Sequence, residues 1–120
     1  MNSHSELDNS KVAEVFKALG HPTRVFIVKE LSAGELPAGY FAEKLDADFS
    51  TISQHLNVLK RAGVIESQKR GLNVFYRLVY PCIPWLIARM EYRDRISESE
   101  AKKLMKQLDR QRREFESLEC

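Results

Sequence analysis

Long hydrophobic runs and cysteines are the two features that this sequence has least of. No apolar run approaches the roughly 20 residues that a membrane-spanning helix needs, so we expect no membrane partner. Residues 1–11 are polar and unlike a secretory signal peptide, which predicts a cytoplasmic protein. The only two cysteines are Cys82 and Cys120. In the cytoplasm we expect both thiols to be reduced.

Proline and glycine are also scarce. Four prolines and five glycines in 120 residues leave no room for a low-complexity linker. A hydrophobic content of 43% supports one core, and the chain is too short for two ordinary domains. We therefore expect a single domain over residues 1–120, with its core at 10–80 and C-terminal dimerisation helices at 81–120.

The net positive charge of the chain is low, and most of the excess of basic residues lies in one segment. The formal net charge is +2. Residues 1–48 carry five basic and eight acidic side chains, a net of −3, and residues 81–120 carry nine and eight, a net of +1. Residues 49–80 carry five basic and one acidic side chain, a net of +4. A chance excess is one explanation; contact with the phosphates of a nucleic acid is the other.

Apolar side chains recur at helical spacing along most of the chain. We expect helices over residues 10–19, 22–33, 37–45, 48–62 and 83–94, and a sixth helix that begins at a capping box of Ser97 and Glu100. Ser10 and Asp48 are the expected N-caps of the first and fourth helices. Two strands, 64–68 and 74–79, flank a loop at 69–73 in which Gly71 and Asn73 tolerate positive φ. The expected fold is mainly α with a β-hairpin.

The fourth expected helix has one apolar and one polar face. At 100° per residue, Ile52, Leu56 and Leu59 form a buried stripe, and Gln54 lies on the opposite side. Glutamine can pair with adenine in the major groove, and hydroxyls and N–H groups at a helix start suit phosphate. An ordinary solvated helix face is the alternative. The expected DNA contacts of this helix are Ser50, Thr51, Ser53, Gln54, His55, Asn57 and Arg61.

The loop after this helix adds a second candidate DNA contact. Lys69 and Arg70 stand at the expected tip of the hairpin, where a wing would cross the DNA backbone. The segment 37–45 would act as the support helix, 46–47 as the turn and 48–62 as the reading helix. Together these elements predict a reader of double-stranded DNA.

Three segments carry a resemblance to a known family. FKALGHPTRVFIVKEL, STISQHLNVLKRAGVIES and KRGLNVFYRL, within about residues 15–81, resemble the ArsR/SmtB family of bacterial winged helix-turn-helix repressors. The Ser53-x-His55-Leu56 motif, the Ala62-Gly63 stop and the strand 75–78 are similar to that family's signature. The resemblance implies a winged helix-turn-helix homodimer, paired through its terminal helices, that represses an operator until an inducer binds.

The last helix carries an apolar seam that suits such pairing. Ala101, Leu104, Leu108, Gln111, Phe115 and Leu118 follow a 3-4 spacing with one polar position. The seam is too short for a lone coiled coil, so packing along a dimer axis fits better. The expected dimer contacts are Val12, Phe16, Trp85, Leu104, Leu108 and Phe115.

The inducer site is the least defined part of the resemblance. Where the family carries Glu-Leu-Cys-Val-Cys, residues 35–39 read Glu-Leu-Pro-Ala-Gly, and no histidine lies on the expected terminal helices, where the family's other metal site occurs. Cys82 and Cys120 remain, with His4 as a further candidate, and the Pro81-Cys82 pair resembles arsenical-responsive members. Thiolates favour thiophilic ions, which makes trivalent arsenic a candidate ligand. A Cys82–Cys120 disulfide as a redox sensor is another reading.

Several alternatives stay open. Cys82 can be a small buried hydrophobic residue and Cys120 an incidental terminal one. The dimer can be a constitutive or protein-regulated repressor, or an interaction module that does not bind DNA. An enzyme with a cysteine nucleophile would need a base near Cys82, and the nearest histidine in sequence is His55. We therefore predict that the protein is not an enzyme.

Overall fold

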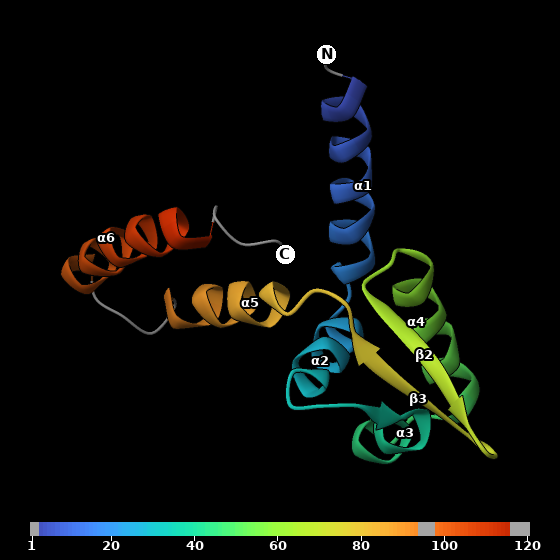
Figure 1. Cartoon of the computed structure of the whole chain (residues 1–120). Helices are drawn as coiled ribbons and strands as arrows, with labels where there is room; N and C mark the ends of the chain where they lie inside the picture. The colour runs from blue at the N-terminus through green and yellow to red at the C-terminus, as the bar shows by residue number, and fades with distance from the viewer. Residues whose placement is uncertain (1–2, 94–97, 116–120) are drawn as a thin grey trace. The chain divides into compact units, whose positions relative to one another are not determined.

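A computed structural model describes residues 3–93 and 98–115 of the chain. The chain divides into two compact units, Met1–Tyr80 and Pro81–Cys120. The first unit contains four helices and a small sheet, and the second contains two helices (Figure 1). The mainly helical fold with a hairpin, expected from the sequence, is confirmed.

The first unit is built from α1 (Ser3–Leu19), α2 (Pro22–Leu31), α3 (Ala38–Leu45) and α4 (Phe49–Arg61). Its buried core draws on every one of these helices and on the start of the hairpin. The buried side chains are Ala18, Ile27, Val28, Leu31, Ala38, Phe41, Ile52, Leu56, Leu59, Val64 and Ile65. The core therefore anchors α4 along one face and leaves the opposite face free.

The sheet has three antiparallel strands in the order β1-β3-β2. β2 (Ile65–Arg70) and β3 (Asn73–Leu78) form the hairpin, and β1 (Leu36–Pro37) pairs with the outer side of β3. The sequence did not predict β1, because two residues are too few to show an alternating pattern. β2 runs back along α4, so the hairpin tip lies toward the end at which α4 begins (Figure 1).

The hairpin is longer than the sequence predicted, and its turn is shorter. Lys69 and Arg70 lie within β2, opposite Val74 and Asn73, rather than in a five-residue loop. The turn consists of Gly71 and Leu72, and Gly71 has a φ of 64°. Asn73, in contrast, does not use positive φ. One glycine at the first central position satisfies a two-residue turn of the II′ class, so the flanking cations can stay in the strand ladder.

The helix boundaries follow the sequence signals, with one exception. His21 caps α2 by accepting from the Thr23 N–H, and Asp48 caps α4 by accepting from the Thr51 N–H. α1, in contrast, begins at Ser3 and not at Ser10, so the prediction of Ser10 as an N-cap is wrong. Serine costs only a fraction of a kcal/mol inside a helix, so a capping residue does not oblige a helix to start beside it.

The second unit consists of α5 (Cys82–Arg93) and α6 (Glu98–Phe115). Arg89 joins them by donating from Nη2 to the Gln111 Oε1 at 3.0 Å. The predicted cap at Ser97 lies outside the described residues. None of the described helices is long and apolar enough to cross a membrane.

Candidate nucleic-acid interface

α4 presents the two faces that its sequence predicts. Ile52, Leu56 and Leu59 have no exposed surface. The predicted outward row is exposed along the whole helix, and it consists of Ser50, Gln54, Asn57 and Arg61. Among the described residues, Gln54, Asn57 and Arg61 make no hydrogen bond or ion pair within the chain. These three side chains are therefore ready to pair with an external partner.

The first turn of α4 is organised by Asp48. Its Oδ1 accepts from the Thr51 N–H at 2.7 Å and from the Ser50 hydroxyl at 3.0 Å. Hydrogen bonds from the Thr51 side chain, the Thr51 N–H and the Ser50 hydroxyl, in that order, lower the pKa of the Asp48 carboxyl, because they favour its charged form. The Thr51 N–H is already used by this cap, so the predicted contacts of Ser50 and Thr51 with DNA would be made by their hydroxyls, and they stay predictions. The hydroxyls of Ser50 and Thr51 remain on the exposed surface.

His55 lies on the flank of α4 and turns toward α2. Its Nδ1 lies 3.2 Å from Arg24 Nη1, and its ring centroid lies 4.4 Å from that of His21. Arg24 also donates from Nε to the Ala18 carbonyl at 2.5 Å. Burial, His21 and Arg24 together lower the pKa of His55. His55 thus ties α4 to α2, and its predicted contact with DNA stays a prediction, as does that of the half-buried Ser53.

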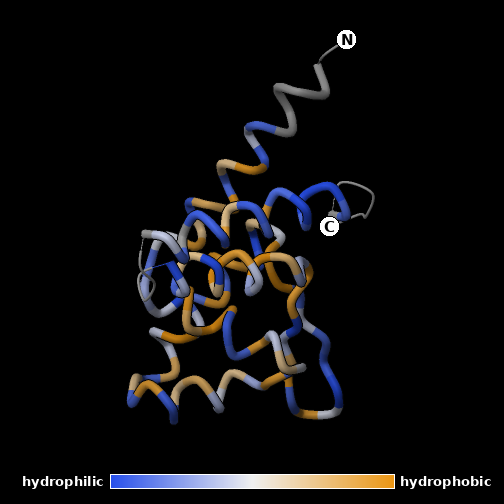
Figure 2. Tube along the Cα trace, turned by 90° about the vertical axis from the view of Figure 1, so that its left-hand side faces the viewer, coloured by the Kyte–Doolittle hydropathy of each residue, from blue (hydrophilic) through white to orange (hydrophobic). Residues whose placement is uncertain are grey.

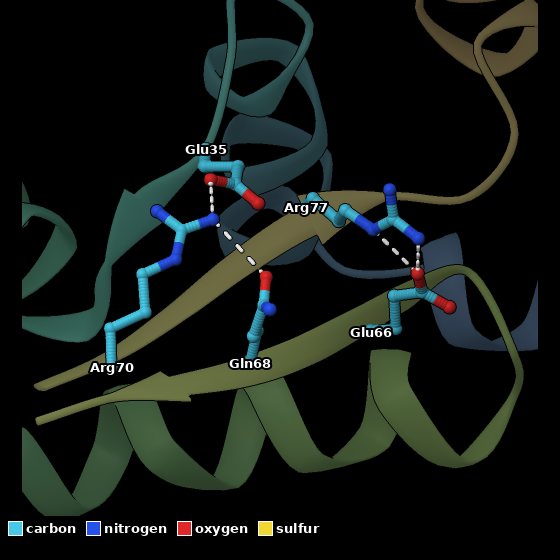
Figure 3. Close-up of polar contacts among 5 residues, drawn as sticks. All are labelled: Glu35, Glu66, Gln68, Arg70 and Arg77. Atoms are coloured by element: carbon cyan, nitrogen blue, oxygen red, sulfur yellow. Dashed lines mark hydrogen bonds and ion pairs between the residues drawn. The ribbon is translucent and has the colours of Figure 1, made fainter.

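Arg70 of the hairpin, unlike the polar row of α4, has partners within the chain. Arg70 pairs with Glu35, with Nη2 and Oε1 2.5 Å apart, and also donates to the Gln68 side chain at 3.1 Å (Figure 3). Its guanidinium lies 5.1 Å from the centroid of the Phe75 ring. Lys69 is exposed on the adjacent position. The Glu35 carboxylate therefore offsets part of the positive charge that Arg70 would present to a phosphate.

A second ion pair repeats this pattern at the base of the hairpin. Arg77 of β3 pairs with Glu66 of β2, which lies directly across the ladder (Figure 3). Both side chains are about half exposed, 61% for Arg77 and 48% for Glu66. The sequence counted Arg77 in the positive charge of residues 49–80, but here its charge is balanced locally. The net charge that the hairpin offers to a phosphate backbone is correspondingly smaller.

Two residues near the interface were missed by the sequence analysis. Phe49 opens α4 and is 59% exposed, although it is aromatic. Its place directly after the N-cap of the expected reading helix was a signal that could have found it. Glu35 was considered only as part of an absent cysteine motif, and it is the partner of Arg70. No sequence signal links Glu35 to Arg70, because β1 brings them together.

The expected dimer contacts fall into two groups. Val12 and Phe16 of α1 are 51% and 58% exposed, and α1 shows alternating hydrophilic and hydrophobic turns (Figure 2). Leu104 is only 7% exposed within one chain and so has little surface for a partner, and its role as a dimer contact stays a prediction. Trp85 and Leu108 are half-buried. Phe115 ends α6, and its side chain lies outside the described residues.

Cys82 begins α5 and is half-buried. Its sulfur is bonded in a disulfide, which differs from the expectation of a free thiol. Cys120, the other predicted inducer ligand, lies outside the described residues, as does its distance from Cys82. Among the residues that the structure describes, no group of three or more His, Cys, Asp or Glu side chains could hold a metal ion.

Comparison with known proteins places these features in a family. Residues 19–68 match the family model of a helix-turn-helix domain. The HTH-type transcriptional regulator MJ1325 of Methanocaldococcus jannaschii is 43% identical over 70 residues, which are 58% of this chain and 79% of that protein. The transcriptional repressor SdpR of Bacillus subtilis is 42% identical over 64 residues, which are 53% of this chain and 71% of that protein.

A solved structure shares the fold. The homodimeric winged helix-turn-helix DNA-binding domain of Mb0332 from Mycobacterium bovis, described as a possible ArsR-family regulator, superposes with a TM-score of 0.67 at 26% identity. The superposition covers 77% of this chain and 85% of that domain. The exposed row of α4 thus lies on the helix that follows the turn of a winged helix-turn-helix.

Proposed function

Since this chain belongs to the ArsR/SmtB family of winged helix-turn-helix transcriptional regulators, we propose that it represses transcription as a homodimer bound to operator DNA. The observation that carries the proposal is the outward face of α4. Gln54, Asn57 and Arg61 are exposed and unengaged there, above a fully buried apolar stripe. Such a helix can enter a major groove without disturbing the core that holds it.

The two parts of the interface would bind different parts of the DNA. Gln54 offers an amide that can pair bidentately with adenine. Lys69 and Arg70 of the hairpin suit the phosphates beside the groove, which position the protein but do not specify sequence. In a two-fold dimer the half-sites would stand about one helical turn apart, roughly 34–36 Å.

A second copy of the chain is the partner that best suits the exposed face of α1. Val12 and Phe16 follow one another by four residues and so lie on one side of the helix. Apolar side chains exposed to this extent on a helix commonly mark an interface. Pairing through α1 would also give the two reading helices that a palindromic operator requires.

DNA affinity tests the proposal directly. Fluorescence anisotropy would measure binding of the full chain to DNA from upstream of its own coding region, at several salt concentrations. We expect Gln54→Ala to weaken binding by about 1–3 kcal/mol if Gln54 reads a base. Gln107→Ala, the same change at an exposed position of α6, is the matched control and should bind like the wild type. Equal affinities for all three proteins would remove Gln54 from the interface.

Release from DNA by thiol oxidation is a second candidate property, favoured by the disulfide at Cys82. Two thiols would form the disulfide and pass two electrons and two protons to the oxidant. Diamide should then release the reduced wild type from DNA, dithiothreitol should restore binding, and Cys82→Ser should not respond. Trivalent arsenic at the reduced thiol is the competing proposal. Release by arsenite in the absence of any oxidant would favour it, and no response to either reagent would remove both.

A further inference from the structure

Phe49 is the one large apolar side chain exposed on the described surface of α4. We propose that its ring contacts the C5-methyl group of a thymine in the operator, so that Phe49 contributes to sequence specificity. This inference rests on the proposed function, because it needs α4 to lie in a major groove. Nothing in the helix itself requires an aromatic residue at this position, since the cap is completed by Asp48, Ser50 and Thr51.

The position of Phe49 places its ring at the leading end of the helix. It is the first residue of α4, directly after the N-cap Asp48. At 100° per residue Phe49 lies on the flank of α4, about 140° from Gln54, and the tilt of helix side chains toward the N-terminus inclines it toward the start of the helix. In helix-turn-helix proteins the N-terminal residues of the second helix are the ones that contact base edges. Phe49 is 59% exposed there, beside the exposed Ser50.

The two ends of α4 differ in charge. Its last turn carries Lys60 and Arg61, and both are exposed. Its first turn carries no basic residue, and the N-cap before it is the carboxylate of Asp48. The hydroxyls and N–H groups at this end suit a phosphate, but the apolar ring of Phe49 does not, so a phosphate is a poor partner for that ring. A base edge with an apolar group is a better one, and the thymine methyl is the apolar group that base pairs present in the major groove.

The hairpin supports the same placement. Its tip lies toward the end at which α4 begins, so phosphate contacts by Lys69 would hold this end of α4 against the duplex (Figure 1). Contact with a second copy of the chain is the competing explanation for an exposed aromatic residue. The exposed apolar pair Val12 and Phe16 lies on a different helix, α1, and does not include Phe49.

Replacement of thymine by deoxyuridine removes only the methyl group and so isolates the contact. The full-length wild type would first select its preferred site from random duplex DNA. Each thymine of that site would then be replaced by deoxyuridine, and affinity would be measured by anisotropy. We expect one position per half-site at which the wild type loses roughly four-fold in affinity, the value of one buried methyl-sized group.

The variants decide whether Phe49 makes that contact. Phe49→Ala should bind more weakly than the wild type and should no longer distinguish thymine from deoxyuridine at that position. Gln54→Ala, the control, should bind weakly but keep the four-fold difference. Circular dichroism melts and light scattering would check that Phe49→Ala keeps its fold and its oligomeric state.

Three outcomes would overturn the inference. The wild type could show no difference between thymine and deoxyuridine at any position. Phe49→Ala could keep the full difference. It could also lose the oligomeric state of the wild type, which would make Phe49 a contact between protein chains. Failure of the wild type to select any sequence would instead remove the proposed function, and the inference with it.

Discussion

α4 and the hairpin prepare their side chains for DNA in different ways. Gln54, Asn57 and Arg61 of α4 project from a buried helix and have no partner among the described residues. Arg70 and Arg77 of the hairpin are already paired, with Glu35 and Glu66. A base contact by α4 therefore disturbs no internal ion pair, whereas a phosphate at Arg70 meets a charge that Glu35 already offsets in part. A count of basic residues in the sequence therefore overstates the net positive charge that the hairpin presents to DNA phosphates.

The largest expected effect comes from the buried side of α4. Leu56→Ala should lower the free energy of unfolding by about 2–5 kcal/mol, because Leu56 has no exposed surface and its loss leaves a cavity. Asn57→Ala, one residue along and exposed, should change stability by less than about 0.5 kcal/mol. Urea unfolding would measure both. Similar losses for the two variants would mean that α4 does not have one buried and one free face.

The next effect separates the two cations of the hairpin. Lys69→Ala should reduce the slope of log affinity against log salt by about one unit if Lys69 contacts a phosphate. Arg70→Ala should reduce it by less, because Glu35 already offsets part of the charge of Arg70. Anisotropy at a series of salt concentrations gives both slopes. A larger change for Arg70 than for Lys69 would show that the ion pair does not restrain Arg70.

Release of Arg70 should strengthen DNA binding by a smaller amount. Glu35→Gln keeps the shape of the side chain and removes its charge, so a phosphate no longer competes with a carboxylate. Exposed ion pairs are worth about 0.2–1 kcal/mol, which predicts an affinity gain of up to several-fold at low salt. Glu66→Gln is the matched control for loss of one negative charge on the hairpin. Equal gains from both variants would point to overall charge and not to Arg70.

The smallest expected effect concerns pH and the flank of α4. His55 has a pKa below its usual 6.5 in the folded chain, so the unfolded chain binds its proton more readily. The contribution of His55 to the free energy of unfolding is therefore constant above pH 6.5. It becomes less favourable as the pH falls from 6.5 toward the pKa of His55 in the folded chain. Melting temperatures at pH 7.5 and 5.5 should fall less for His55→Gln than for the wild type. An identical fall would mean that the contacts with His21 and Arg24 do not disfavour the charged ring.

Local signals in the sequence predicted which face of α4 is buried and which is exposed. The spacing of Ile52, Leu56 and Leu59 predicted which side of α4 is buried, and Asp48 predicted where the helix begins. These features depend on neighbours within one or two turns, so a single segment contains the information. Ser10 shows the limit of such signals. Its side chain is suited to an N-cap, but Ser10 lies inside α1, which begins at Ser3.

The contacts that modify the interface could not be predicted in this way. Glu35 meets Arg70 only because β1 adds to the hairpin, and His55 meets Arg24 only because α2 packs on α4. Glu35 and Arg70 are separated by 35 residues of chain, and Arg24 and His55 by 31. Leu104 likewise carried the right apolar pattern for a dimer seam, but a single chain already buries it.

The sequence by itself determined the helix-turn-helix, the polar row of α4 and the family, because periodicity and capping act over short stretches of chain. Tertiary structure alone decided which charges of the hairpin are neutralised, which donors of the first turn are already used, and that Phe49 stands exposed. Those properties depend on which side chains from distant parts of the sequence lie close together in the folded chain, and no local sequence pattern predicts such contacts.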